Sequence, residues 1–456
     1  MHSAQSKCTK RYFDCIIQPH FGLKSSAFID QTQIFSPSPQ FEMLTTPIQN
    51  FNISSTFNYP NNLQFNVIKK CATTKARLSH LILPHGLTPL PTFMPVATQA
   101  SIKGLTYDQI NAIGISLILN NTYHLSLRPG TQILDQSNGV HNFQSWNSNL
   151  LSDSGGFQMV SLSKLTKVTE DGVEFQNPFD QSNQDKILLT PERSIEIQQS
   201  LGTDIIMQLD DVVSSTTPDP ERVEEAMQRS IRWLDRCIQQ HFHPRNLLPP
   251  PHPQSLFAII QGGLSPKLRS RCLDAMTHPA RMSKLGGYAI GGLSGGESKN
   301  QFWRIIHQCT HKLPELKPRY CMGIGYSEDL VVAVALGIDM ADCVFPTRTA
   351  RFGVALTFKG PLKLFKRQPF ERDFAVIDSD CGCLSCQNGN GQSRSFLFQL
   401  LKTNNPVAIQ SITAHNLFYQ SQLMEKIRTS IAQEKFPQFL IEFFHEYYAG
   451  DVSSYP

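Results

Sequence analysis

Short apolar runs alternate with stretches of helical periodicity from residue 78 onward. The apolar part of each run stops near a Gly, Asn, Asp or Gln, which favour the end of a strand and the start of a loop. Eight runs of this kind span residues 91–99, 116–122, 150–156, 204–211, 256–263, 288–296, 319–325 and 341–347. Eight strand-and-helix units over about 260 residues predict an α/β fold, a parallel (β/α)8 TIM-like barrel. A doubly wound open sheet shows the same alternation and remains the alternative.

Two helix starts are marked by a capping residue followed by proline. Thr190 precedes Pro191 and Asp219 precedes Pro220, so helices are expected to begin at both prolines. After Pro220, apolar residues recur at three- to four-residue spacing, at Val223, Met227, Ile231, Leu234 and Ile238. The second helix is therefore expected to bury one face. Residues 244–253, which contain PPPHP, are predicted to form a surface loop.

Composition divides the chain into three parts. Residues 1–65 are rich in Asn, Gln, Ser and Pro and lack periodicity, so we expect a disordered extension. The low content of acidic residues gives this segment only a weak resemblance to a transit peptide. Residues 66–370 are assigned to the barrel. Residues 371–456 are expected to form a zinc-binding and helical region packed on the barrel, with helices over 396–402 and 417–432.

The overall composition narrows the class of protein. Forty per cent of the 456 residues are apolar, which is enough for a substantial core, and the net charge of +4 permits a nucleic-acid partner without requiring one. The 11 cysteines are an odd number without the spacing of a disulfide framework. The longest apolar stretch, residues 330–338, is shorter than the roughly 20 residues of a membrane span. These features predict an intracellular protein in a reducing compartment.

A metal-ligand pattern follows the eighth unit. Cys381, Cys383 and Cys386 have the spacing C-x-C-x-x-C, and His415 lies further along the chain. Three thiolates and one imidazole complete a tetrahedral Zn²⁺ shell with no open position, which is typical of a structural site. The alternative is a set of unrelated thiols in a Gly-rich loop. The tight spacing favours one structural zinc ion that holds the C-terminal helices on the barrel.

Three aspartates stand at predicted strand ends: Asp153, Asp210 and Asp342. In a barrel such residues converge on one mouth, where one carboxylate can attack carbon while another moves a proton. A single aspartate at a strand end more often caps the next helix. Glycine pairs at 155–156, 262–263 and 291–292 stand beside them, and glycines let a flat ligand approach the backbone closely. The combination favours a base-binding pocket.

The longer motifs resemble those of the tRNA-guanine transglycosylases, in the same order along the chain. They are DSGGFQMVSL, the strand end QLDD, AIIQGGL, AIGGLSGGE, DCVFPTRTAR and the CxCxxC…H cluster. The similarity runs from about residue 78 to the C-terminus. It implies a barrel fold, zinc, and exchange of the wobble guanine of GUN-anticodon tRNAs (Asp, Asn, His, Tyr) for queuine. It also implies a heterodimer with a noncatalytic homologous subunit, in the cytoplasm and in association with the mitochondrial outer membrane.

The resemblance also assigns roles to individual residues. Asp342 is similar to the nucleophile that attacks the anomeric carbon, and Asp153 to the proton acceptor. The implied substrate-binding residues are Ser154, Gly155, Gly156, Phe157, Asp210, Gln261 and Gly292. The implied RNA-binding residues are Gly323, Ile324, Gly325, Tyr326, Ser327, Glu328, Asp329, Thr347, Arg348, Thr349, Ala350 and Arg351. Retention of ribose configuration requires two inversions and hence a covalent intermediate on a carboxylate, as in retaining glycosidases.

Residues 347–367 give local support for RNA contact, because they include six basic residues and no acidic one. A solvated basic face is the alternative. Two positions depart from the family pattern: Ala341 stands where Phe is usual, and Asn120 where Gly is usual. Both departures affect the packing of the expected pocket, and neither removes a reacting group.

Two further positions bear on the incoming base. Bacterial members of the family, which use a smaller deazaguanine precursor, have Cys at the position of Val212 and usually Val at that of Gly295. Queuine carries a bulky cyclopentenediol, so Gly295 is expected to leave room for it. Three alternative functions stay open: a noncatalytic homologue of the same fold, an enzyme for the smaller precursor, and an RNA-binding barrel with a zinc clamp.

Overall fold

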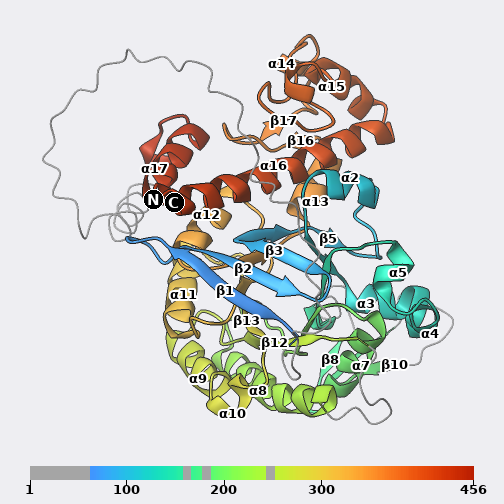
Figure 1. Cartoon of the computed structure of the whole chain (residues 1–456), viewed down its shortest axis with the longest axis vertical. Helices are drawn as coiled ribbons and strands as arrows, with labels where there is room; N and C mark the ends of the chain where they lie inside the picture. The colour runs from blue at the N-terminus through green and yellow to red at the C-terminus, as the bar shows by residue number, and fades with distance from the viewer. Residues whose placement is uncertain (1–61, 158–165, 177–185, 243–251, 456) are drawn as a thin grey trace, which may run out of the picture.

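The computed structural model describes residues 62–157, 166–176, 186–242 and 252–455 (Figure 1). The predictions of a disordered N-terminal extension and of a Pro-rich loop fall almost entirely on residues 1–61 and 243–251, which lie outside the described residues.

A barrel of parallel strands forms the centre of the protein. Its members, in the order in which they pair, are β4 (Thr92–Met94), β15 (Met340–Asp342), β14 (Arg319–Cys321), β13 (Gly287–Ile290), β12 (Ser255–Ile260), β11 (Ile205–Met207), β7 (Asn149–Ser152), β6 (Leu117–Asn120) and β5 (Val96–Ala97). β4 and β5 are two halves of one run, separated by Pro95. Because β4 pairs with β15 and β5 pairs with β6, this run joins the last strand to the second one. The predicted barrel is confirmed, and the open sheet is excluded.

Helices cover the outside of the barrel between its strands (Figure 1). They are α2 (Tyr107–Ala112), α3 (Thr122–Leu125), α4 (Thr131–Gln136), α5 (Val140–Gln144), α7 (Pro191–Leu201), α8 (Pro220–Phe242), α9 (Pro266–Met276), α10 (Pro279–Met282), α11 (Lys299–Lys312), α12 (Ser327–Ala335) and α13 (Phe345–Arg351). α7 and α8 begin at the two predicted prolines. The Thr190 hydroxyl accepts from the Arg193 amide, and Met227 and Leu234 of α8 are buried as expected.

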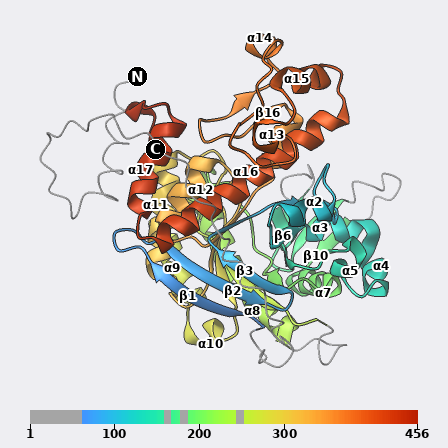
Figure 2. The same ribbon diagram turned by 45° about the horizontal axis from the view of Figure 1, so that its top comes forward.

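An antiparallel sheet that the apolar pattern did not predict closes the N-terminal end of the barrel. It consists of β1 (Gln64–Lys70), β2 (Arg77–Leu83) and β3 (Gly86–Leu90), which lie side by side in Figure 2. Leu81, Leu83 and Leu90 pack with the inward-facing side chains of the barrel strands in one apolar cluster. The opposite end, where the barrel strands have their C-termini, is therefore the open mouth.

Two further groups of elements are attached to the barrel. A small antiparallel sheet follows β7: β8 (Lys167–Val168), β9 (Val173–Gln176) and β10 (Lys186–Leu189). The strands and α-helices after α13 are β16 (Val354–Ala355), β17 (Leu362–Lys363), α14 (Arg367–Phe370), α15 (Arg394–Lys402), α16 (Pro406–Ala432) and α17 (Phe436–Tyr447). The C-terminal region, residues 371–456, contains the last three of these helices. α16 crosses the barrel from α15 to the N-terminal sheet, as Figure 2 shows. It begins eleven residues before the predicted position, because Asn405 caps it and Pro406 opens it.

Candidate active site

Five residues predicted from the sequence lie at or just beyond the C-terminal ends of five barrel strands. They are Asp153 after β7, Asp210 after β11, Gln261 after β12, Gly292 after β13 and Asp342 at the end of β15. Because all barrel strands are parallel, these ends meet at one mouth. The Gln261 amide donates to Asp210 Oδ2 at 2.6 Å, and the Ser154 hydroxyl faces Asp210 Oδ1 at 3.4 Å. The structure thus brings side chains from three of these loops into contact.

Asp342 is held by two donors on a single carboxylate oxygen. The Tyr320 hydroxyl donates to Oδ1 at 2.5 Å, and the Gly323 amide donates to the same oxygen at 2.9 Å. Burial raises the pKa of the Asp342 carboxyl, and these two hydrogen bonds oppose that rise. Oδ2 takes no part in either bond. The arrangement fixes the carboxylate and leaves one oxygen available for reaction.

Asp153 is a buried carboxylate with donors on both oxygens. The Asn121 amide donates to Oδ2 at 2.7 Å, and the Thr122 backbone N–H donates to Oδ1 at 2.8 Å. Both donors come from the loop after β6, where Asn121 also caps α3. The neighbouring Asn120, at the position where the family usually has Gly, turns instead to Gln144 of α5. Hydrogen bonds that N–H groups donate to a carboxylate are strong, so Asp153 is oriented before any ligand arrives.

The mouth of the barrel combines an acid with a raised pKa and a glycine that cannot be replaced. Burial raises the pKa of Asp210 to about 6, and the nearby Asp211 acts in the same direction. Gly292 has φ of +66°, and a Cβ there would collide with Gln261 Oε1. Ser154, Gly155 and Gly156 are buried beside them, whereas the Phe157 side chain is 60% exposed.

Hydrogen bonds tie the loops after β11 and β13 together at the mouth of the barrel. The Ser215 hydroxyl donates to Glu297 Oε2 at 2.6 Å, and Glu297 also accepts from the amides of Ser294 and Gly295. A Cβ at Gly295 would lie 2.6 Å from Ser215 Oγ. The absence of a side chain at Gly295 therefore permits contact between the two loops, a different role from the open space expected from the sequence.

The predicted RNA-binding residues divide into exposed and buried groups. Arg348 and Arg351 of α13 are exposed, and so are Gly323 and Tyr326 in the loop after β14. Thr349 and Glu328 are half-buried. The remaining members are buried: Ile324, Gly325, Ser327, Asp329, Thr347 and Ala350. The exposed residues flank the loop that carries Asp342, so this side of the mouth presents two arginines and a tyrosine to solvent.

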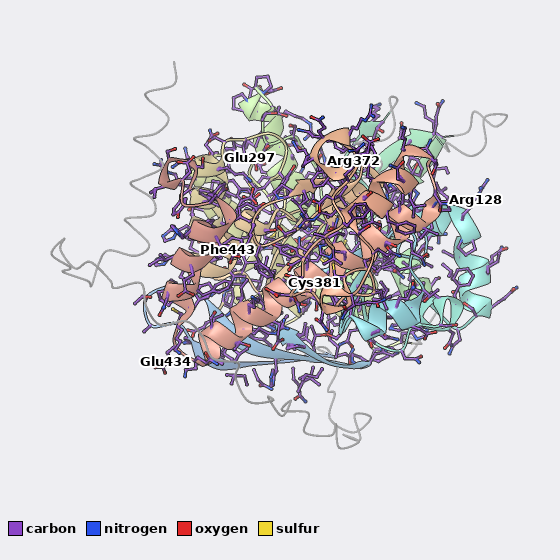
Figure 3. The ribbon with its side chains drawn as sticks, turned by 90° about the horizontal axis from the view of Figure 1, so that it is seen from above. Arg128, Glu297, Arg372, Cys381, Glu434 and Phe443 are labelled. Carbon is purple, nitrogen blue, oxygen red and sulfur yellow. The ribbon has the colours of Figure 1, made fainter. Side chains whose placement is uncertain are left out.

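The four predicted metal ligands form one buried cluster around His415 of α16; Cys381 is labelled in Figure 3. His415 Nδ1 lies 3.6, 3.5 and 3.4 Å from the sulfurs of Cys381, Cys383 and Cys386. A tetrahedral shell with ~2.3 Å metal–sulfur and ~2.0 Å metal–nitrogen bonds places such atoms about 3.6 Å apart. His415 Nε2 is 2.8 Å from the Leu356 carbonyl oxygen, which fixes the ring orientation. The cluster is compatible with a structural metal.

A second group, His85, His141 and Asp204, lies at the closed end of the barrel. The two imidazoles stack with centroids 3.6 Å apart and an interplanar angle of 16°. A metal ion lies in the plane of each imidazole that binds it, and two nearly parallel stacked planes do not share one point near their nitrogens. Asp204 is satisfied by His85 at 2.7 Å and by the Leu150 amide at 2.7 Å. We read this group as a hydrogen-bonded link between β3, α5 and β11.

The barrel, the carboxylates at its open mouth and a Cys3His cluster that is compatible with a structural metal are the features of a (β/α)8-barrel enzyme. A family model described as queuine tRNA-ribosyltransferase matches residues 71–449. The chain is 52% identical over 398 residues to the Schizosaccharomyces pombe queuine tRNA-ribosyltransferase catalytic subunit, covering 86% of this chain and 94% of the relative. For the Caenorhabditis elegans protein of the same name, the identity is 43% over 381 residues, with 84% and 90% covered.

A bacterial relative is similarly close. The queuine tRNA-ribosyltransferase of Caldanaerobacter subterraneus is 44% identical over 388 residues, with 85% of this chain and 98% of the relative covered. The chain therefore belongs to the queuine tRNA-ribosyltransferase family, and its predicted classes of enzyme and fold are confirmed. Among the described residues, no helix combines the length and apolar character that crossing a membrane requires.

Proposed function

We propose that this chain is the catalytic subunit of a tRNA-guanine transglycosylase that exchanges the wobble guanine of GUN-anticodon tRNAs (Asp, Asn, His, Tyr) for queuine. The observation that carries the proposal is the pair of pre-oriented carboxylates, Asp153 and Asp342, at the open end of the barrel. A noncatalytic homologue or an RNA-binding barrel needs neither carboxylate. The names of the fission yeast and nematode relatives support the catalytic role.

Asp342 acts as the nucleophile. Its free oxygen, Oδ2, forms a bond to C1′ of the wobble nucleotide while the bond from C1′ to the guanine nitrogen breaks and its electron pair goes to the base. The product is a covalent ribosyl-aspartate ester. The ring nitrogen of the entering base then attacks C1′ from the opposite side and releases the carboxylate, so that configuration is retained after two inversions. The wobble base lies in a loop, where unstacking is inexpensive.

Asp153 moves the proton in both half-reactions. It gives a proton to the leaving guanine and takes one from the entering base. Asp153 is therefore protonated before guanine leaves and regains its proton from the entering base. The donors Asn121 and Thr122 hold it in one orientation and stabilise the carboxylate that exists between the two half-reactions.

The base edge is matched by groups of opposite hydrogen-bonding character. Asp210 accepts from the ring N–H and the exocyclic amino group, because an ionised carboxylate offers only acceptors. The Gln261 side-chain amide and the Gly292 backbone N–H donate to the exocyclic carbonyl oxygen of the base. Residues 154–157 form one wall, and the exposed Phe157 ring can stack on the base.

The tRNA backbone is bound beside the nucleophile. Arg348 and Arg351, on the first helix after Asp342, present two exposed cations to phosphate groups. Residues 323–329 contribute through the exposed Gly323 and Tyr326. A planar guanidinium is well suited to phosphate because it donates two parallel hydrogen bonds.

The Cys3His cluster holds one structural Zn²⁺, the metal that this donor set prefers. His415 is on α16, so the ion fastens the C-terminal region, residues 371–456, to the barrel domain, residues 66–370. Its contribution is to folding, since four protein ligands leave no position for substrate.

The partner is a noncatalytic homologous subunit in a heterodimer, as the words "catalytic subunit" in the relatives' names suggest. A cytoplasmic location is supported by the described cysteines, which form no disulfide. Association with the mitochondrial outer membrane rests on the family resemblance alone.

Incorporation of labelled guanine into tRNA tests the proposed function directly. The chain, combined with its partner subunit, should incorporate label into GUN-anticodon tRNAs and lose it again on addition of queuine. Asp342→Asn should incorporate none. If the wild type incorporates label and only the smaller precursor displaces it from the tRNA, the bacterial-type activity is favoured. If the wild type incorporates no label, a noncatalytic homologue is favoured.

A further inference from the structure

Arg269 is a fully buried cation that faces backbone carbonyls. It lies in the first turns of α9, and its side chain has no exposed surface. Nε, Nη1 and Nη2 donate to the carbonyl oxygens of Gly263, Ile260 and Gly291 at 2.8, 2.6 and 2.8 Å. No carboxylate of the described residues forms an ion pair with it. These carbonyls belong to the ends of β12 and β13, the two strands that lead to Gln261 and Gly292.

Burying a guanidinium without a counter-ion is unfavourable, and burial accordingly lowers the pKa of Arg269. Backbone carbonyls compensate for this through their dipoles, whose negative ends all point at the cation. A neutral apolar side chain would avoid the desolvation cost but would take the guanidinium donors away from three backbone carbonyls. Because one of these carbonyls is that of Gly291, the cation also acts on the peptide unit that carries the Gly292 N–H.

The peptide bond gives the link to the ligand. The Gly291 carbonyl shares its peptide unit with the Gly292 N–H, so a cation on this oxygen withdraws electron density from that N–H. Hydrogen-bonded groups polarise each other in this way, and the effect is stronger in a buried site than in water. The Ile260 carbonyl stands in the same relation to the Gln261 N–H, but that N–H faces the Cys272 sulfur at 3.3 Å. Gly292 is thus the polarised donor of the pocket.

We propose that Arg269 is a positioning residue that acts through the Gly291–Gly292 peptide and strengthens the Gly292 N–H toward the exocyclic carbonyl oxygen of the exchanged base. The inference rests on the proposed function. When the bond from C1′ to the leaving guanine breaks, the electron pair goes to the purine, and negative charge spreads over the ring to this oxygen. A preorganised donor aimed at developing charge lowers the barrier, as in an oxyanion hole.

The test compares guanine with 6-thioguanine, which keeps the ring N–H and the amino group but replaces the carbonyl oxygen by sulfur, a weak acceptor. Affinities of both purines are measured by equilibrium dialysis for the wild type and for Arg269→Met. The preference for guanine should shrink about three- to tenfold in the variant, which is the loss expected for one weakened hydrogen bond. Arg269→Lys, which keeps the charge but not the three-way fork, should give an intermediate preference.

Arg271→Met is the matched control, since Arg271 lies two positions further along α9 and pairs with Glu224 at the surface. It should leave the guanine preference unchanged. If Arg269→Met weakens both purines by the same factor, Arg269 is only structural and the proposal is wrong. If Arg269→Met fails to fold, Arg269→Lys provides the test. A preference of Arg269→Lys for guanine over 6-thioguanine that equals the wild-type preference overturns the proposal. Failure of the wild type to bind guanine would instead contradict the proposed function.

Discussion

Replacement of Gly295 by valine tests how the rim of the pocket selects the incoming base. The perturbation is local: the new Cβ would lie 2.6 Å from Ser215 Oγ and 3.2 Å from the Ser215 amide nitrogen. Ordinary van der Waals contact needs about 3.5 Å, so the loop after β11 has to withdraw by close to 1 Å. That movement breaks the bond from Ser215 to Glu297, which ties the loops after β11 and β13 together. We expect the side arm of the base to lie at this point.

Forcing extra atoms into a packed site costs roughly 1–3 kcal/mol, so kcat/KM for queuine should fall about tenfold to a hundredfold. The smaller precursor lacks the cyclopentenediol that we expect to lie at the rim, so its kcat/KM should fall less. The assay is steady-state displacement of labelled guanine from tRNA by each base. Ser215→Ala/Gly295→Val is the control, because it removes the hydroxyl that the new side chain meets; the cost of the valine should be smaller in this background. Equal efficiency with queuine for the wild type and Gly295→Val would refute the reasoning, and an equal loss with both bases would point to general distortion of the loop.

Four further outcomes are expected. Asp342→Asn should abolish the protein–RNA adduct that survives denaturing electrophoresis, and an adduct that persists would exclude Asp342 as nucleophile. Tyr320→Phe should lower kcat with little change in the KM for tRNA, because only the donor to Asp342 Oδ1 is lost; a changed KM with unchanged kcat would contradict this. Cys383→Ser should lower the zinc content measured by atomic absorption and reduce Tm by roughly 5 °C or more, whereas a metal-free protein of full stability would contradict the structural role. Because the pKa of Asp210 is raised to about 6 and its ionised form accepts from the base, the KM for the base should rise as pH falls through 6; a flat KM between pH 5 and 7 would argue against this role.

The strand ends could be predicted from the sequence because each apolar run stops at a glycine or a polar residue. Asp153, Asp210 and Asp342 were found in this way, as was the Cys3His cluster from its spacing. The supporting donors were missed. Tyr320 stands in the apolar run RYCMGIG and reads as a core residue, and its hydroxyl reaches Asp342 only because β14 and β15 are neighbours in the barrel.

Asn121 and Thr122 were missed for a different reason. They stand at the polar end of an apolar run, and only the pairing of β6 with β7 brings them to Asp153. Gly295 shows a further limit. The sequence shows that Gly295 has no side chain, but it does not show where a side chain at this position would point. In the structure a Cβ at Gly295 would point toward Ser215.

The N-terminal sheet was not predicted because its strands pair with one another and do not alternate with helices. In β2 the alternation of buried and half-buried residues is regular, yet the strand is followed by a turn and another strand rather than by a helix. Its partners in the barrel core, such as Met207 and Phe257, are distant in sequence. Contacts of this kind depend on closure of the whole barrel.

The course of α16 has a consequence for how the protein is made. This helix carries His415, reaches the loop after β14 through Gln420, bonds the Pro91 carbonyl through Arg428, and ends where Lys69 meets the Ala432 carbonyl. Synthesis runs from the N-terminus, so every barrel strand leaves the ribosome before the helix that spans them exists. Until α16 emerges, the nascent barrel therefore lacks the contact between this helix and the N-terminal sheet, and the three cysteines lack His415. Premature termination anywhere upstream of residue 406 removes all of these ties at once.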